Sequence, residues 1–110
     1  SSFSHTHIRK ERRRMLKHVV FMKFNKSATD AGIADLEQGL GRLPAVIPEI
    51  KGYEFVRDII HSERSYDFCL VSSFDDLEAM KRYQVHPDHV VVLGKVKALC
   101  ESILAVDFLS

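Results

Sequence analysis

The side chains best suited to chemistry lie between Tyr83 and His89, in the run Tyr-Gln-Val-His-Pro-Asp-His. This run holds a phenol and two imidazoles, which can donate, accept or transfer protons near neutral pH. A further histidine, His18, opens the apolar segment 17–24. If these groups meet in one pocket, they could form a small active site that transfers protons. His18, Tyr83 and His89 are therefore the candidate catalytic and ligand-binding residues.

Each of these residues also has a structural interpretation, and the two compete. Buried histidines are commonly satisfied by a backbone carbonyl or a neighbouring hydroxyl. Pro87 is placed to start a helix, so His86 is expected to cap that helix. His89 falls on the apolar stripe of the same helix and is expected to line a pocket. For His18 and Tyr83 the sequence leaves both interpretations open.

A metal site is a third interpretation of the histidines. His86 and His89 are spaced i, i+3, and His18 is the remaining candidate ligand. A catalytic zinc site usually needs three protein ligands in an open geometry. The intervening proline and the absence of a partnered carboxylate motif argue against it. We therefore expect no metal and no cofactor.

The composition is that of one small globular domain. The chain has 110 residues, of which 45% are hydrophobic and 28% charged. No apolar run approaches the roughly 20 residues of a membrane span, so we expect no membrane partner. Cys69 and Cys100 lack a CxxC spacing and sit among apolar residues, which favours free buried thiols. With no apolar stretch typical of a secretory signal, these features predict a cytoplasmic protein.

The charge is distributed unevenly. The net charge is +1, but residues 1–14 carry five basic residues and one acidic residue, so the other 96 residues sum to −3. Arg12-Arg13-Arg14 could contact nucleic acid or an anionic surface. The acidic remainder has no basic stripe, which argues against nucleic-acid binding. We expect a disordered basic leader over 1–14 and a folded domain over 15–110.

Hydrophobic periodicity predicts alternating strands and helices. Helix-capping residues at 27–30 and 75–78 and the proline at 87 mark three helix starts, and Pro44 marks the end of the first helix. The expected stripe of the third helix is His89, Leu93, Val96 and Cys100, with Ile103 alongside. The aromatic residues at strand spacing, including Tyr53 and Phe68, are expected in the core. The predicted strands are 16–24, 53–60, 66–74 and 104–109.

This order predicts an α+β fold, a ferredoxin-like four-stranded antiparallel sheet with helices on one face. Alternation places His18, Val20 and Met22 toward the helices. The opposite face would be apolar, which is a liability in a monomer. Pairing two sheets in a two-fold dimer would cover it and give a dimeric α+β barrel. The residues assigned to this outer face are Val19, Phe21, Val56, Ile60, Cys69 and Val71.

The segments 17–24 and 83–89, with the apolar helix near Leu40, the run 44–52 and the ending 105–108, resemble the stress-responsive α/β-barrel domain family. The resemblance covers nearly all of residues 15–110. It implies a homodimer with a cavity between each sheet and its helices. One plant member of the family is a cofactor-free polyketide cyclase that closes a ring by aldol condensation.

The resemblance places that cyclase's functional tyrosine and histidine at Tyr83 and His89, and its strand-opening histidine at His18. A further cyclase histidine falls at Phe68, which thereby becomes an expected ligand-binding position. We expect a homodimer with a small apolar pocket that binds a small hydrophobic or polyketide-like ligand. The alternatives are a non-catalytic stress or assembly protein, and a cofactor-free cyclase or monooxygenase-like enzyme. An open pocket around the three residues would favour binding or catalysis, whereas a filled core would favour the structural protein.

Overall fold

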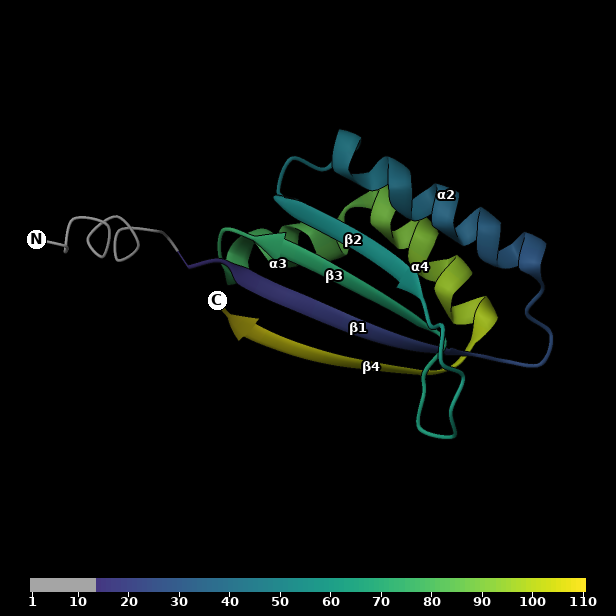
Figure 1. The fold of residues 1–110 in the computed structure, drawn as a ribbon. Helices are drawn as coiled ribbons and strands as arrows, with labels where there is room; N and C mark the ends of the chain where they lie inside the picture. The colour runs from purple at the N-terminus through teal and green to yellow at the C-terminus, as the bar shows by residue number, and fades with distance from the viewer. Residues whose placement is uncertain (1–13) are drawn as a thin grey trace, which may run out of the picture.

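The structure is a computed structural model that describes residues 14–110 of the chain. The predicted leader therefore lies outside the described residues, apart from Arg14. In the described part, strands and helices follow one another as the sequence predicts (Figure 1). The elements are β1 (Leu16–Phe24), α2 (Asp30–Val46), β2 (Gly52–Arg57), β3 (Phe68–Phe74), α3 (Leu77–Val85), α4 (Pro87–Leu99) and β4 (Cys100–Leu109).

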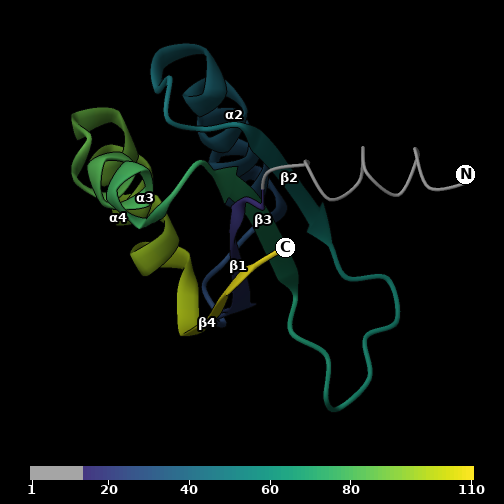
Figure 2. The ribbon, with the colours of Figure 1, turned by 90° about the vertical axis from the view of Figure 1, so that its left-hand side faces the viewer.

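The four strands form one antiparallel sheet in the order β2-β3-β1-β4. Figure 2 shows the sheet nearly edge-on, with α2, α3 and α4 on the same side of it. This arrangement confirms the ferredoxin-like fold. The central strand β1 pairs with β3 on one side and β4 on the other, so that Val20 lies between Leu70 and Ala105. Residues on β1 thus stand at the middle of both sheet faces.

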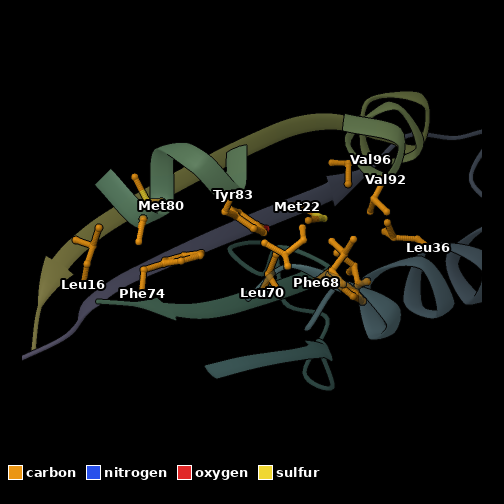
Figure 3. Close-up of a cluster of buried hydrophobic side chains, with 14 residues drawn as sticks. Leu16, Met22, Leu36, Phe68, Leu70, Phe74, Met80, Tyr83, Val92 and Val96 are labelled. Atoms are coloured by element: carbon orange, nitrogen blue, oxygen red, sulfur yellow. The ribbon is translucent and has the colours of Figure 1, made fainter. Parts of the chain in front are cut away.

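The hydrophobic core lies between the sheet and the helices. Strand residues such as Met22 and Phe74 meet residues from all three helices, as Figure 3 shows for the labelled side chains. Leu36 and Leu40 of α2 are 0% and 2% exposed. Each such side chain contributes about 1.5–3 kcal/mol through burial. Replacing Leu36 with alanine in a core packed this closely costs about 2–5 kcal/mol.

Each helix begins at a side-chain cap that the sequence predicts. The Thr29 hydroxyl accepts the N–H of Gly32 at the start of α2, and the Asp76 carboxylate accepts the N–H of Ala79 at the start of α3. Such caps are each worth about 0.5–2 kcal/mol. At the start of α4, His86 Nδ1 accepts the N–H of Asp88 at 3.1 Å, and Pro87 occupies the first turn. His86 therefore caps this helix, as expected.

Strand β3 begins at Phe68 rather than at residue 66. Three other predicted boundaries are wrong as well. Helix α2 continues through Pro44 to Val46, because a proline in the last turn removes a single helical hydrogen bond and Ile47 N–H still bonds Leu43 O at the end. Strand β2 ends at Arg57 rather than at residue 60. The Asp58 carboxylate accepts the N–H of His61, which has a φ of 57°, and this turns the chain into a loop that lasts until β3 begins.

The last wrong boundary is the start of β4. This strand begins at Cys100, so Cys100 and Ile103 belong to the sheet and not to the helical stripe. Cys100 has extended backbone angles and pairs with Phe24 beside a register shift in β1. Pairing with β1 therefore decides the conformation of a segment whose local pattern continues the helix. Both cysteines are free, as expected, but they are half-buried rather than buried.

The outer face of the sheet is apolar across its strands, as the sequence predicts. Val19 lies between Val71 and Val106, and Phe21 lies between Cys69 and Leu104. Strand β4 adds several exposed apolar side chains to this face, including Val106 at 54% and Leu104 at 51% exposure. The wrong assignment is Ile60, which lies in the loop after β2 and is 71% exposed.

Candidate functional site

A cavity of about 270 Å³ lies between the sheet and the helices. Its wall is mostly apolar and comes from β1, β3 and β4 below and from α2 and α4 above. Four polar side chains interrupt this wall: His18, Tyr83, Gln84 and His89. The structure therefore brings together the three residues that the sequence singles out, from two segments about 65 positions apart.

His89 lies in the first turn of α4, where Pro87 and the His86 cap fix the start of the helix. Its Nδ1 is 3.1 Å from the backbone oxygen of Gln84, near the end of α3. A carbonyl oxygen only accepts, so Nδ1 carries the proton and donates it. The other ring nitrogen, Nε2, is then left with a free lone pair. His89 is thus arranged as an acceptor or a base.

The environment favours the neutral form of this imidazole. Burial lowers the pKa of His89 below its ordinary value, and the nearby His18 and His86 lower it further. The hydrogen bond to the Gln84 carbonyl opposes these effects. Desolvation penalises the charged ring, so His89 is uncharged at neutral pH. An uncharged histidine can accept a proton from a ligand O–H or C–H group.

Tyr83 lies in the last full turn of α3, and its ring is held from two sides. The ring centroid is 4.8 Å from that of Phe74 and 4.2 Å from that of His89 (Figure 3 shows Tyr83 and Phe74). The residue is 1% exposed, yet it lines the cavity. Its hydroxyl is 2.8 Å from the hydroxyl of Tyr53 on β2. Burial raises the pKa of Tyr83, and the hydrogen bond with Tyr53 lowers it.

His18 stands on β1 and reaches the cavity from the sheet side. Its cross-strand neighbour on β4 is Asp107, and the Asp107 carboxylate accepts a hydrogen bond from His18 Nδ1. The carboxylate orients the ring, so Nε2 is the nitrogen left free for another partner. The His18 side chain is 13% exposed and Asp107 is 44% exposed, so the pair sits at the edge of the cavity near solvent.

Sequence reasoning missed Asp107 and the specific role of Tyr53. Both contact a site residue through pairings between distant segments, and the local pattern around each resembles an ordinary strand. One signal was present: if 104–109 is a strand, alternation puts Asp107 on the same face as Ala105. A carboxylate on a helix-facing strand position needs a partner.

Two expected residues stand apart from the cavity. Phe68, the expected ligand-binding position, is 2% exposed and is not one of the residues that line it. Its ring packs in the neighbouring core against Phe24 at 5.9 Å and Phe55 at 6.2 Å. His86 is used as a helix cap. Among residues 14–110, no group of three or more His, Cys, Asp or Glu side chains is placed to hold a metal ion.

The arrangement can hold an apolar molecule and contact an oxygen atom on it. Uncharged His89 offers an acceptor, and the Tyr83 hydroxyl offers a donor beside it. Within the described residues, no helix combines the length and apolarity needed to cross a bilayer. The sheet order, the helices on one face and the cavity between them define a ferredoxin-like α+β barrel protein. Comparison with known families gives the particular family.

The chain belongs to the family defined by the stress responsive A/B barrel domain, whose profile matches residues 16–110. It is similar to olivetolic acid cyclase of Cannabis sativa, with 24% identity over 95 residues that cover 84% of this chain and 94% of the cyclase. It is 28% identical over 99 residues to the stress-response A/B barrel domain-containing protein DABB1 of Arabidopsis thaliana. That match covers 87% of this chain and 47% of DABB1, so the chain spans about half the length of that relative.

A solved structure from Thermobifida fusca has the same fold. It is described as a dimeric ferredoxin-like protein and superposes with a TM-score of 0.80 at 30% sequence identity. The match covers 88% of this chain and 92% of the other. A second dimeric protein of ferredoxin-like fold, from Bacteroides fragilis, superposes with a TM-score of 0.77 at 28% identity, covering 86% and 94% of the two chains.

Proposed function

We propose that this chain forms a homodimer in which each protomer binds one small apolar molecule bearing a carbonyl or phenolic oxygen. The observation that carries the proposal is the cavity of about 270 Å³ whose apolar wall is interrupted by His18, Tyr83 and His89. Ligand sites are typically concave and apolar, with a few polar groups that orient the ligand. The volume lies near the lower end of such sites, which suits a ligand of about a dozen non-hydrogen atoms.

The polar groups of the cavity determine which oxygen-containing group the ligand should carry. His89 is uncharged and presents Nε2 as an acceptor, and Tyr83 can present a hydroxyl donor. A neutral enol or phenol can satisfy both groups, because its O–H donates to His89 Nε2 and its oxygen accepts from Tyr83, whereas a ketone carbonyl can only accept from Tyr83. A carboxylate would gain no cationic partner at His89, because burial holds that ring in its uncharged form. The apolar remainder of the ligand would lie against side chains such as Met22, Leu70 and Val96.

The homodimer rests on the outer face of the sheet. Val19 and Phe21 stand at its centre, and β4 extends it with Leu104 and Val106, each about half exposed. A stable interface typically buries roughly 1,600 Å² in total, and a face-to-face pair of such sheets provides an apolar surface for it. The similar proteins from Thermobifida fusca and Bacteroides fragilis are described as dimeric.

A second candidate function is cofactor-free proton transfer of the kind that closes a polyketide ring. Its support is the pairing of a base, His89, with a hydroxyl donor, Tyr83, at a ring-centroid distance of 4.2 Å. In such a step His89 removes a proton from carbon beside a carbonyl, and Tyr83 hydrogen-bonds the resulting enolate oxygen. The relative from Cannabis sativa is named a cyclase. Phe68, where the resemblance expects a further histidine, argues for a different substrate or step.

The non-catalytic alternative is a protein whose only product is the dimer. That function has no use for an open cavity, and packing to native density would be expected to fill it. The cavity between Leu40, Val92 and the sheet is instead left open in the protomer. The cavity therefore supports ligand binding over a purely structural role.

The variant His89→Ala tests the proposal. We expect binding of an alkylphenol such as 4-butylphenol, whose O–H can donate to His89 Nε2, to weaken about tenfold or more while the dimer persists, as followed by calorimetry or NMR. The matched control is His61→Asn, which removes an exposed imidazole from the loop after β2 and keeps a residue type that tolerates the positive φ at this position. If His89 only supports the core, its loss would instead cost about 1–3 kcal/mol of stability and leave the remaining binding unchanged.

A further inference from the structure

A second tyrosine contacts the candidate site from outside the cavity. Tyr53, on β2, points its hydroxyl at that of Tyr83 at 2.8 Å, and the two rings meet edge to face at 6.2 Å and 72°. Tyr53 is not one of the residues that line the cavity, whereas Tyr83 is. The Tyr53 ring is also held by Phe55, edge to face at 6.5 Å. Tyr53 can therefore influence a ligand only through Tyr83.

The direction of this hydrogen bond depends on which of the two hydroxyl protons can find a further acceptor. Each phenol carries one hydroxyl proton and can also accept a hydrogen bond. In the described part of the chain, the hydrogen-bond partner of the Tyr53 hydroxyl is Tyr83. If Tyr83 donated to Tyr53, the Tyr53 proton would have no acceptor among residues 14–110. A largely buried hydroxyl without an acceptor is unfavourable.

In the opposite direction it is the Tyr83 proton that needs a further acceptor. When Tyr53 donates to Tyr83, the Tyr83 proton is free to turn toward the cavity, where a ligand oxygen or water can accept it. The Tyr83 ring cannot swing away, because Phe74 and His89 hold it on two sides. The hydroxyl is therefore confined in both position and orientation.

We propose that Tyr53 is a positioning residue which donates its hydrogen bond to Tyr83 and so turns the Tyr83 hydroxyl proton into the cavity. Tyr83 then acts as a donor toward a carbonyl oxygen of the ligand, next to the acceptor nitrogen of His89. This inference rests on the proposed function and deepens it, because it assigns an accepting oxygen, as in a ketone, to the Tyr83 side of the ligand.

A pair of probes that differ by one group tests the role. Butyrophenone and butylbenzene have similar shapes, but only the ketone can accept a hydrogen bond. The measured quantity is the ratio of their dissociation constants on each variant, obtained by NMR titration of the intact protein. We expect Tyr83→Phe to lower the preference for the ketone roughly threefold to tenfold, the range of one neutral hydrogen bond.

Tyr53→Phe keeps the ring contacts and removes only the hydroxyl. We expect it to lower the same preference about twofold to fivefold, because the Tyr83 proton loses its fixed direction. In the Tyr83→Phe background, Tyr53→Phe should change the preference no further, because the two residues act in series. The matched control is Tyr66→Phe, which removes a hydroxyl bonded to Ser102 and should leave the preference unchanged.

A folded Tyr53→Phe protein with the wild-type ketone preference would overturn the proposal, as would an additive double variant. A separate measurement needs no ligand. In protein with 13C-labelled tyrosine rings, a slowly exchanging hydroxyl proton couples through bonds to the ring that bears it. Coupling to the Tyr53 ring supports the inferred direction, and coupling to the Tyr83 ring overturns it. If wild-type protein binds neither probe, the proposed ligand function fails, while this measurement still decides the direction of the hydrogen bond.

Discussion

The two faces of the sheet carry different chemistry, although the same strands build both. On β1 the helix-facing residues are His18, Val20 and Met22, which line the cavity. Their immediate neighbours Val19 and Phe21 belong to the outer face. Successive strand residues point to opposite faces, so one step along the chain separates the ligand cavity from the surface proposed to bind a second copy.

The two faces of the sheet also differ in how far other parts of the chain cover them. On the inner face Met22 and Leu70 are 2% and 4% exposed, because the helices lie over them. On the outer face Val106 is 54% exposed and Phe108 is 44% exposed. Over β1 and β3 the inner face is thus covered within one chain, while the outer face still has apolar area to bury. Substitutions on the two faces should therefore impair different properties of the protein.

The largest effect is expected from a charge on the outer face. Phe21→Asp would place a carboxylate at the centre of the proposed interface, where each copy would bury an unpaired charge. We expect the dimer to dissociate or the protein to unfold, as measured by sedimentation velocity and circular dichroism. The control Val90→Asp puts the same charge on an exposed position of α4 and should leave the dimer intact. A well-folded wild-type monomer at micromolar concentration would contradict the interface.

The matching change on the inner face should remove ligand binding and leave the dimer. Ala105 lines the cavity from β4, so Ala105→Ile would place three extra carbon atoms in open space. We expect butyrophenone binding to fall at least tenfold, with a change in stability below about 1.5 kcal/mol because the added atoms occupy a void. The control is Val106→Ile, one residue along on the opposite face. Unchanged binding in the Ala105 variant would show that the ligand lies elsewhere.

A smaller effect is expected from pH, and it should come from the inner face. Burial lowers the folded-state pKa of His89 below its ordinary value of 6.5, so the unfolded chain takes up the proton first as the pH falls. Stability should therefore decrease as the pH drops below about 6.5 and level off below the folded pKa. Binding of a phenol should weaken over the same range, because protonated His89 Nε2 can no longer accept the hydrogen bond of its O–H. Chemical denaturation at a series of pH values checks this, and the decrease should be smaller in His89→Ala.

The smallest effect is expected from removal of residues 1–14, the basic leader that the sequence predicts. Among the described contacts, the deletion removes a hydrogen bond from exposed Arg14 to the backbone oxygen of Leu109, at 3.1 Å. Loss of a surface contact of this kind changes stability by about 0.5 kcal/mol or less. Thermal melting and sedimentation should match the full chain. A large loss of stability would show that the leader packs against the domain.

Much of the fold could be predicted from sequence because local signals agree with the final structure. The alternating apolar residues of 16–24 give the bounds of β1, and the caps at Thr29, Asp76 and His86 start the helices where expected. The errors arise where pairing with a distant strand determines the local conformation. Cys100 continues a helical pattern but pairs with Phe24, and no local feature reports that pairing.

In the candidate site, too, some features could be predicted from the sequence and others could not. His18, Tyr83 and His89 could be proposed from residue type and from the resemblance, and the structure places all three on one cavity. Their hydrogen-bond partners could not be predicted from the sequence. Asp107 bonds His18 from a neighbouring strand, and Tyr53 on a strand bonds Tyr83 on a helix. Such contacts depend on register, which the sequence of either segment does not contain.

One residue, His86, sets the distance between the two groups proposed to contact the ligand. It is the C-cap of α3, which carries Tyr83, and also the N-cap of α4, which carries His89. The angle between the two helices therefore depends on the backbone of a single junction, at φ −62° and ψ 134°. With no longer linker to absorb movement, donor and acceptor would shift together as one rigid corner. A ligand too large to contact both groups from the cavity could be accommodated only by unwinding a helix end, so this rigid junction would limit the size of the ligand.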